Sequence, residues 1–287
     1  MSIERGPSRT AITTATLRAA HYILDAEPKI LDDRFARAFA GFASDDQLLQ
    51  ALNEASYPDV RRMRTLFALR NRYAEDELRK AIEHGTSQYI ILGAGLDSFA
   101  YRRSDLMGAL DVFEVDHPAS QAWKRARVAE LGIKTPTRLH YVPIDFERET
   151  LTAGLTMAGI DFTDRTFSSW LGVTQYLSAG VVLGTLREVA ELATSGSEIV
   201  FQFVVPAASL PGNEGSLVET LAAGAAALGE PWLSFFEPEE LEAQLRQMGF
   251  AKVFHFDPQQ ATERYLLGRT DDLRVPAYFH MISAGVA

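Results

Sequence analysis

The sequence contains no cysteine, and this absence limits the kinds of site that the chain can build. Disulfide bridges, thiolate metal sites and cysteine nucleophiles are all excluded, and a reducing compartment is favoured. Apolar runs of roughly 20 residues, which a membrane-spanning helix needs, are also missing, and the first residues contain no apolar core typical of a secretory signal. We therefore expect a cytoplasmic protein without a membrane partner and without a metal site.

Positive charge is scarce. The chain has 28 Lys and Arg residues against 38 Asp and Glu residues, which gives a formal net charge of −10. Binding to nucleic acid depends on clustered positive charge, so we expect no nucleic-acid partner. The short basic run of Lys124, Arg125 and Arg127 is predicted to be an exposed helix face. Neither charge nor composition indicates an oligomeric state.

Long linkers and internal repeats are also absent from the 287 residues, and 47% of the residues are hydrophobic, enough for a substantial core. We expect one compact unit, in which residues 1–84 form a helical cap region and residues 85–287 form the core. Apolar residues three and four positions apart predict helices over most of residues 8–84, including one around 31–42 and a long one from about Tyr57 to His84. These helices either pack on the sheet alone or also form a lid over the substrate.

Beyond residue 85, short apolar runs alternate with helical patterns. This alternation is typical of βαβ units and predicts an α/β fold with a doubly wound, mostly parallel sheet. The predicted strands are residues 89–92, 111–116, 139–144, 166–171, 198–205, 251–256 and 278–284, whereas residues 207–228 give no clear pattern. Open sheets of this kind bind ligands at the carboxyl ends of their strands. Ligand contacts are therefore expected after the first four strands.

Two glycines, Gly93 and Gly95, follow the first predicted strand, where they permit a tight turn and close approach of a ligand. Glu114 and Asp116, at the end of the second strand, lie 21 positions after Gly93 and Gly95 respectively. Nicotinamide dinucleotide sites and adenosyl-nucleoside sites share this spacing, because in both a carboxylate accepts hydrogen bonds from ribose hydroxyls. Asp116 is our first choice for that contact, with Glu114 as the alternative or as its support.

Two residues of the turn favour a ligand without phosphates. Ser98 stands where a dinucleotide fingerprint has its third glycine. Asp97 lies at the helix start where a pyrophosphate would bind, and its carboxylate would repel the phosphates, although it can also serve as a simple helix cap. S-adenosylmethionine meets no such repulsion, and acidic residues favour its sulfonium and ammonium groups. An NAD(P)-dependent oxidoreductase is the alternative.

Four motifs in order, YIILGAGLDSFAYRR, FEVDHP, the ID of VPIDFE, and WLGVTQYL, resemble the leucine carboxyl methyltransferase-like family, specifically its bacterial branch of S-adenosylmethionine-dependent methyltransferases. The resemblance extends over nearly the whole chain. It implies a class I methyltransferase fold, Rossmann-like, with a seven-stranded sheet whose last strand is antiparallel and with N-terminal helices over the site.

The resemblance also implies individual contacts to S-adenosylmethionine. The implied positions are Arg70 near its carboxylate, Gly93 and Gly95 under its amino-acid moiety, Asp116 at its ribose, and Asp145 and Phe146 at its adenine. Carboxyl methyltransferases of this family carry a glutamate after the fourth strand, where this chain has Leu171. The difference argues against a protein C-terminal leucine carboxylate as the acceptor.

Methyl transfer from a sulfonium is an in-line displacement, so the enzyme acts largely by holding the acceptor against the methyl group. An anionic acceptor needs no base, whereas a hydroxyl does. The candidates for the acceptor side are His21, Tyr22, Gln175 and Tyr176, each of which can equally be structural. The sequence thus predicts O-methylation of a hydroxyl or carboxylate on a small metabolite. A cofactor-binding module without catalytic activity is a further alternative.

Overall fold

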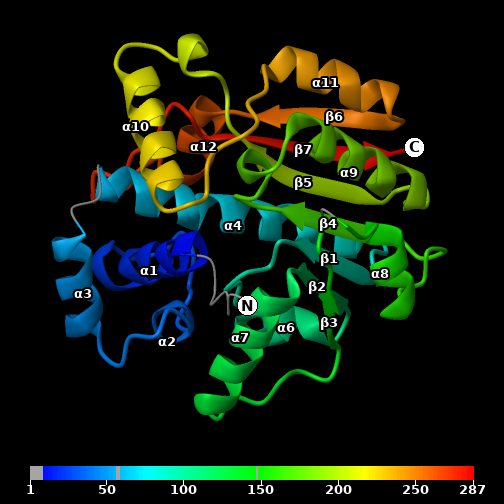
Figure 1. Ribbon diagram of the computed structural model, residues 1–287, viewed down its shortest axis with the longest axis horizontal. Coiled ribbons are helices and arrows are strands. Elements are labelled where there is room, and N and C mark those ends of the chain that lie inside the picture. The colour runs from blue at the N-terminus through cyan, green and yellow to red at the C-terminus, as the bar shows by residue number, and fades with distance from the viewer. Residues whose placement is uncertain (1–8, 56–58, 147) are drawn as a thin grey trace.

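The computed structural model describes residues 9–55, 59–146 and 148–287, and its centre is one seven-stranded sheet (Figure 1). The strands are β1 (Gln88–Leu92), β2 (Asp111–Asp116), β3 (Leu139–Pro143), β4 (Thr166–Trp170), β5 (Glu198–Phe203), β6 (Phe250–Phe256) and β7 (His280–Val286). Their order is β3-β2-β1-β4-β5-β7-β6. Only β7 is antiparallel to its neighbours, β5 and β6, among the described strands. The predicted α/β fold is confirmed.

Helices connect the strands and precede the sheet. They are α1 (Arg9–Leu24), α2 (Ala36–Phe39), α3 (Asp45–Glu54), α4 (Val60–Glu83), α5 (Phe99–Arg102), α6 (Ser104–Met107), α7 (Pro118–Glu130), α8 (Leu151–Met157), α9 (Ala179–Leu192), α10 (Glu214–Ala227), α11 (Pro238–Gln247) and α12 (Pro258–Tyr265), with 3-10 turns η1 (Thr174–Tyr176) and η2 (Ala207–Ser209). The segment without a clear pattern, residues 207–228, therefore holds η2 and α10. The predicted start of the long helix at Tyr57 lies outside the described residues.

The predicted helix around residues 31–42 is wrong except for α2. Side chains there take the backbone N–H groups that a helix would use. The His21 imidazole accepts from the amides of Ile30 and Leu31, and the Asp33 carboxylate accepts from the amide of Ala36 at 3.0 Å. Such bonds compete with helix formation, so the apolar spacing alone was misleading.

The sheet is covered on both faces, which explains why residues 89–92 of β1 form an uninterrupted apolar run. Tyr89 and Ile91 of β1 pack on one side with residues of α4 and α5. Ile90 and Leu92 pack on the other side with α8, α9 and α11. Alternate residues of a strand point to opposite faces, so a single strand contributes to both cores.

The N-terminal helices lie beside the end of the sheet at which β1 and β4 terminate. In Figure 1, α1, α3 and α10 are on the same side of the molecule, and α4 runs from them along the sheet. Helix α1 packs against α4, and α4 in turn contacts β4 and β5. Of the helices in the described residues, none combines the length and the apolar character required to cross a bilayer.

Candidate active site

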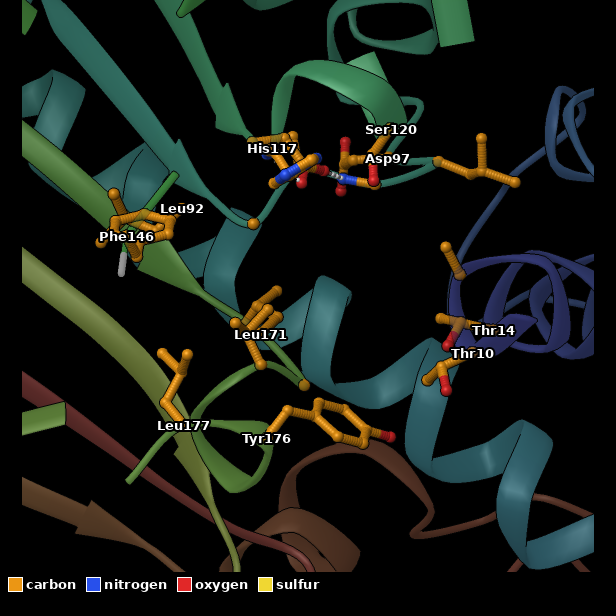
Figure 2. A pocket seen from close by; sticks show the side chains of 18 of the residues that line it. Thr10, Thr14, Leu92, Asp97, His117, Ser120, Phe146, Leu171, Tyr176 and Leu177 are labelled. Carbon is orange, nitrogen blue, oxygen red and sulfur yellow. Dashed lines mark hydrogen bonds between the residues drawn. The ribbon is translucent and has the colours of Figure 1, made fainter. Parts of the chain in front are cut away.

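A cavity of about 910 Å³ opens where the parallel strands end. Its volume falls within the range of roughly 300–1,000 Å³ that is usual for ligand sites. Its lining includes the segments after β1 (residues 93–97), β2 (116–117), β3 (144–146) and β4 (171–173), together with residues of α1 and α4. Figure 2 shows the contributions of these separate segments facing one space. The predicted ligand location at the carboxyl ends of the strands is therefore a real cavity, which we call the cofactor cavity.

The glycine turn after β1 needs its glycines for packing as well as for conformation. Gly93 and Gly95 have φ angles of +66° and +48°, which disfavour any side chain. The amide of Gly93 donates to the carbonyl of Val115 at 2.8 Å, which ties the turn to β2. A Cβ atom on Gly93 would lie 2.4 Å from Cγ2 of Val173. The turn is thus clamped between β2 and the loop after β4.

Asp116 lies at the end of β2 with its carboxylate against the glycine turn. It accepts hydrogen bonds from the amides of Gly95 and His117, the latter at 2.6 Å. Burial raises the pKa of Asp116, and the two amide donors oppose that rise. A carboxylate offers about four lone-pair sites, so acceptor capacity remains for two ribose hydroxyls.

Asp97 is fixed at the start of the helix that follows the glycine turn. Its Oδ1 accepts from the amide of Phe99 at 2.6 Å, although the N-cap position of α5 is Ser98, and its Oδ2 accepts from Asn71 Nδ2 at 3.2 Å. Asp97 also lines the cofactor cavity, as do Asp116 and Asp145. These carboxylates make the cavity suited to a cationic ligand and unsuited to a pyrophosphate.

Arg70 of α4 supplies the complementary charge. Its side chain lies over the ring of Phe67 at 4.5 Å, and its Nη1 donates to Gln202 Oε1 at 3.1 Å. The residue is only 6% exposed, and among the described residues no carboxylate forms a salt bridge with it. Burial, together with the nearby Arg18 charge, lowers the pKa of Arg70 to about 9. A buried guanidinium without a carboxylate partner suits the carboxylate of a ligand.

Gly172 makes room for that guanidinium. A Cβ atom at position 172 would lie 2.2 Å from Arg70 Nη1, and the φ angle of Gly172 is +71°. The glycine in WLGVTQYL is therefore explained by the arginine in ALRNRY, although the two are a hundred residues apart in the sequence.

The remaining predicted cofactor residues also reach this cavity, with one exception. Those that line it are Arg70, Gly93, Gly95, Asp97, Asp116, Asp145, Phe146 and Leu171. In the case of Asp145, Oδ2 lies 3.5 Å from Arg148 Nε. In the case of Leu171, the side chain lies next to Tyr176 in Figure 2, on the wall formed by the loop after β4. The cavity thus combines acidic side chains, a buried arginine and open glycine backbone.

Glu114 is the exception: of the two residues offered for the ribose contact, only Asp116 lines the cavity. It points to the same face of β2 as Asp116 but is only 1% exposed, because α7 covers it. Its Oε2 accepts from Lys124 Nζ at 2.6 Å. Burial raises the pKa of Glu114 to about 7, against the opposing effect of Lys124. The exposed face predicted for the basic run is therefore wrong at Lys124, which is 1% exposed, and right at Arg125.

Two of the four candidates for the acceptor side lie elsewhere. His21 is fully buried, with Nδ1 against Asp25 Oδ2 at 2.7 Å and Nε2 accepting from the Ile30 and Leu31 amides. Both ring nitrogens are therefore used within the protein. His21 organises the segment after α1 and does not line the cofactor cavity. Tyr22 does not line the cofactor cavity either, nor the smaller cavity beside it that is described below. Lys29 lies over its ring.

We expect His21→Leu to lower the free energy of unfolding by about 1–3 kcal/mol, because it leaves the buried amides of Ile30 and Leu31 without an acceptor, whereas Asp25 keeps its ion pair with Arg64. Methyl-transfer turnover of the folded variant should stay near that of the wild type. Urea unfolding and a steady-state rate measure the two effects, with the exposed His84→Leu as control. A variant of normal stability without turnover would restore His21 as a catalytic candidate.

Tyr176 and Gln175 line a second, largely apolar cavity of about 340 Å³, which we call the acceptor cavity. It shares five lining residues with the cofactor cavity: Thr10, Thr14, Arg70, Gly172 and Tyr176. In Figure 2, Tyr176 extends from the loop after β4 toward Thr10 and Thr14 of α1. The two cavities therefore adjoin at these residues.

Several lining residues were not found from the sequence. Those of the cofactor cavity are Thr10, Thr14, Arg18, His117, Ser120 and Glu230, and the acceptor cavity adds Trp232. Thr10 donates from both its amide and its hydroxyl to Glu230, which joins α1 to the segment after α10. The one available signal was the spacing of Thr10 and Thr14, four residues apart and hence on one face of a helix.

Comparison with known proteins gives consistent matches. The family model described as leucine carboxyl methyltransferase matches residues 11–190. A Bacillus subtilis protein named "Putative S-adenosyl-L-methionine-dependent methyltransferase YktD" is 34% identical over 212 residues, 74% of this chain and 69% of that protein. A Mycolicibacterium paratuberculosis protein with the same description is 31% identical over 68% of this chain and 64% of its own length.

The fold has a match among solved structures. A Thermobifida fusca protein, provisionally described as a methyltransferase, aligns with a TM-score of 0.61 and 19% identity over 98% of this chain and 96% of its own.

Proposed function

The chain belongs to the leucine carboxyl methyltransferase family and is an S-adenosylmethionine-dependent methyltransferase, and from this premise we propose that it methylates a hydroxyl or carboxylate oxygen of a small metabolite. The supporting observation is the acceptor cavity. Arg70 is the single charged residue among its described lining residues, which include no Asp or Glu. An ammonium group would be buried there without a counter-charge, at a large cost in free energy. An oxygen acceptor carries no positive charge and does not incur this cost.

Bound S-adenosylmethionine supplies an electrophilic methyl group. We propose that Arg70 binds its carboxylate, the backbone of Gly93 and Gly95 carries its amino-acid moiety, and Asp116 accepts from its ribose hydroxyls. Asp145 and Phe146 then hold the adenine, and Asp97 and Leu171 complete the wall. This assignment is supported by the charges and openings of the cofactor cavity, which match the groups of the ligand in kind.

The acceptor side acts by position. Thr10, Thr14 and Tyr176, where the two cavities adjoin, keep the acceptor oxygen in line with the methyl group, and such positioning can account for most of the rate. The described lining of the acceptor cavity includes no histidine or carboxylate that could act as a base. An acceptor that is anionic at neutral pH therefore fits best. In this proposal the helices before residue 85 cap the site of a cytoplasmic enzyme.

Calorimetry with S-adenosylmethionine, S-adenosylhomocysteine and NAD tests the cofactor assignment, and mass spectrometry of a metabolite library incubated with enzyme and S-adenosylmethionine tests the reaction. We expect both adenosyl ligands to bind, NAD not to bind, and the products to be methyl ethers or esters. Binding of NAD alone would favour an oxidoreductase. Products methylated only on nitrogen would contradict the oxygen acceptor, and any methylated product excludes an inactive module.

We expect Asp116→Ala to weaken binding of S-adenosylhomocysteine by about 5- to 150-fold, which corresponds to about 1–3 kcal/mol for hydrogen-bonding groups left unpaired. Asp111→Ala is the matched control, since Asp111 begins the same strand and pairs with Arg138 at the opposite end. The control should bind the ligand like the wild type. Equal affinities of wild type and Asp116→Ala would remove Asp116 from the ribose contact.

A further inference from the structure

Three buried polar atoms around the acceptor cavity are without a hydrogen-bond partner among the described residues: Arg70 Nε, Gln175 Oε1 and Trp232 Nε1. Gln175 is 8% exposed and Arg70 is 6% exposed, so water does not readily satisfy them. Leaving such atoms unpaired costs about 1–3 kcal/mol each. The proposed cofactor carboxylate can pair with Arg70, so Gln175 Oε1 and Trp232 Nε1 are the two atoms for which a ligand of the acceptor cavity supplies the missing partners.

The wall that carries two of these atoms is itself well ordered by hydrogen bonds. The amide of Leu233 donates to the carbonyl of Gln175 at 2.6 Å, and Ser234 Oγ donates to the carbonyl of Thr174 at 2.8 Å. Gln175 and Trp232 therefore belong to neighbouring segments that are fixed to each other. Both line the acceptor cavity but not the cofactor cavity, in contrast to Arg70, which lines both.

The other lining residues determine the size and polarity of the ligand that the acceptor cavity can hold. It consists largely of aliphatic and aromatic side chains: Met63, Leu66, Phe67, Val204, Leu221, Leu228 and Tyr278. A volume of 340 Å³ holds roughly ten to fifteen non-hydrogen atoms, judged from about 30 Å³ for a water molecule in the liquid. One or two rings fit this space, and a long acyl chain does not.

We propose that the acceptor is a small aromatic or similarly apolar molecule with two oxygen functions. One of them, acidic, lies where the cavities adjoin, beside Thr10, Thr14 and Tyr176, and receives the methyl group. The second is held by the indole N–H of Trp232 and the carboxamide of Gln175. These two residues thus determine specificity by recognising an oxygen that does not react. The inference rests on the proposed function, because it names the acceptor class of that site.

Binding of matched probes to the enzyme saturated with S-adenosylhomocysteine tests this inference. The probes are 6-hydroxy-2-naphthoate, 2-naphthoate, which lacks the second oxygen, and 2-naphthylmethylammonium, which carries the opposite charge. Calorimetry should show binding of 6-hydroxy-2-naphthoate about 3- to 10-fold tighter than that of 2-naphthoate, as expected when neutral hydrogen bonds to the protein replace hydrogen bonds to water, and no binding of the ammonium.

The preference for the hydroxylated probe should disappear in Trp232→Phe, which keeps an aromatic ring and loses the N–H, and should shrink in Gln175→Leu. Leu221→Trp should block both naphthoates by filling the cavity while it leaves the affinity for S-adenosylhomocysteine unchanged. Leu267→Trp, at a residue 88% exposed, is its control. Thermal unfolding confirms that each variant is folded, and should Leu221→Trp fail to fold, Trp232→Phe alone decides.

The inference is overturned if S-adenosylhomocysteine binds while neither naphthoate does. It is also overturned if the wild type binds both naphthoates equally, if Trp232→Phe keeps the preference, or if the ammonium binds as well as the acids. Failure of S-adenosylhomocysteine to bind the wild type contradicts the cofactor assignment instead, so the two failures are distinguishable.

Discussion

Lys124→Met lowers the free energy of unfolding by about 3–5 kcal/mol, the usual result of removing one partner from a buried ion pair. Lys124 Nζ lies 2.6 Å from Glu114 Oε2, and both side chains are almost completely buried. Without the ammonium, the Glu114 carboxylate would be a buried charge facing Asp97 and Asp116, both of which act to raise its pKa. Chemical denaturation at neutral pH measures the loss.

The loss of unfolding free energy in Lys124→Met should depend on pH. The protonation of the Glu114 carboxyl determines whether the loss grows or shrinks as the pH rises. Burial already raises the pKa of Glu114 to about 7 in the folded protein, and removal of Lys124 raises it further. The folded variant then holds a proton that the unfolded chain releases above about pH 4.5, so its stability falls as the pH rises through that range. Unfolding at pH 5 and pH 8 should show a larger deficit at pH 8.

Glu114→Gln in the Lys124→Met background is the control, since it removes the charge that the first substitution leaves uncompensated. We expect it to recover most of the stability and to abolish the added pH dependence. The affinity for S-adenosylhomocysteine should change little in either variant that folds, because Glu114 does not line the cofactor cavity. A large loss of affinity in the folded double variant would mean that Glu114 reaches the ribose after all.

The contrast between Glu114 and Asp116 shows where sequence reasoning ends. Strand periodicity places both on one face of β2, and that prediction is correct. Which of them reaches a ligand depends on how far α7 extends over the strand, and α7 covers Glu114 but not the strand end. A pattern local to β2 contains no information about this packing. That the turns after the parallel strands line one cavity was predictable, because in a parallel sheet those turns meet at one edge.

The contributions of α1 and of residues 229–233 were not predictable in the same way. Neither segment directly follows a strand: α1 precedes the sheet in the sequence, and residues 229–233 follow α10. The Thr10 contact with Glu230 spans 220 residues of sequence. The helix prediction for the segment between α1 and α2 was wrong for a related reason. Its apolar spacing suits a helix, but the side chains of His21 and Asp33 accept hydrogen bonds from its backbone amides and hold it in a non-helical conformation.

Arg18 of α1 bonds both to the segment after α1 and to the turn after β1, so we expect its replacement to cause the second large loss of stability. Its Nε donates to Asp33 Oδ2 at 2.8 Å and its Nη2 to the carbonyl of Leu96 at 2.7 Å. One side chain on α1 thus joins the segment after α1 to the glycine turn after β1. Both charged groups of the Arg18–Asp33 pair are buried. Arg18→Met is therefore expected to lower the free energy of unfolding by about 3–5 kcal/mol.

A matched control exists within the same stretch of chain. Arg34 and Asp32 form a similar pair at 3.0 Å, but their side chains are 71% and 54% exposed. Arg34→Met should leave the free energy of unfolding nearly unchanged, since exposed ion pairs contribute little. Adding Asp33→Asn to Arg18→Met should restore part of the stability. Equal losses in Arg18→Met and Arg34→Met would show that the buried pair has no special weight.

The two arginine variants should also differ in pH dependence and in cofactor affinity. Burial alone would raise the pKa of Asp33, but Arg18 and Arg102 hold it below the usual 3.8. The pair's contribution is therefore complete above that pH and is lost as the pH falls through the lower folded value. Arg18→Met removes this acid sensitivity, and Arg34→Met does not. Because the Leu96 carbonyl loses its donor, Arg18→Met should also weaken S-adenosylhomocysteine binding about 3- to 10-fold. Unchanged affinity would mean that the bond from α1 to the glycine turn after β1 does not contribute to ligand binding.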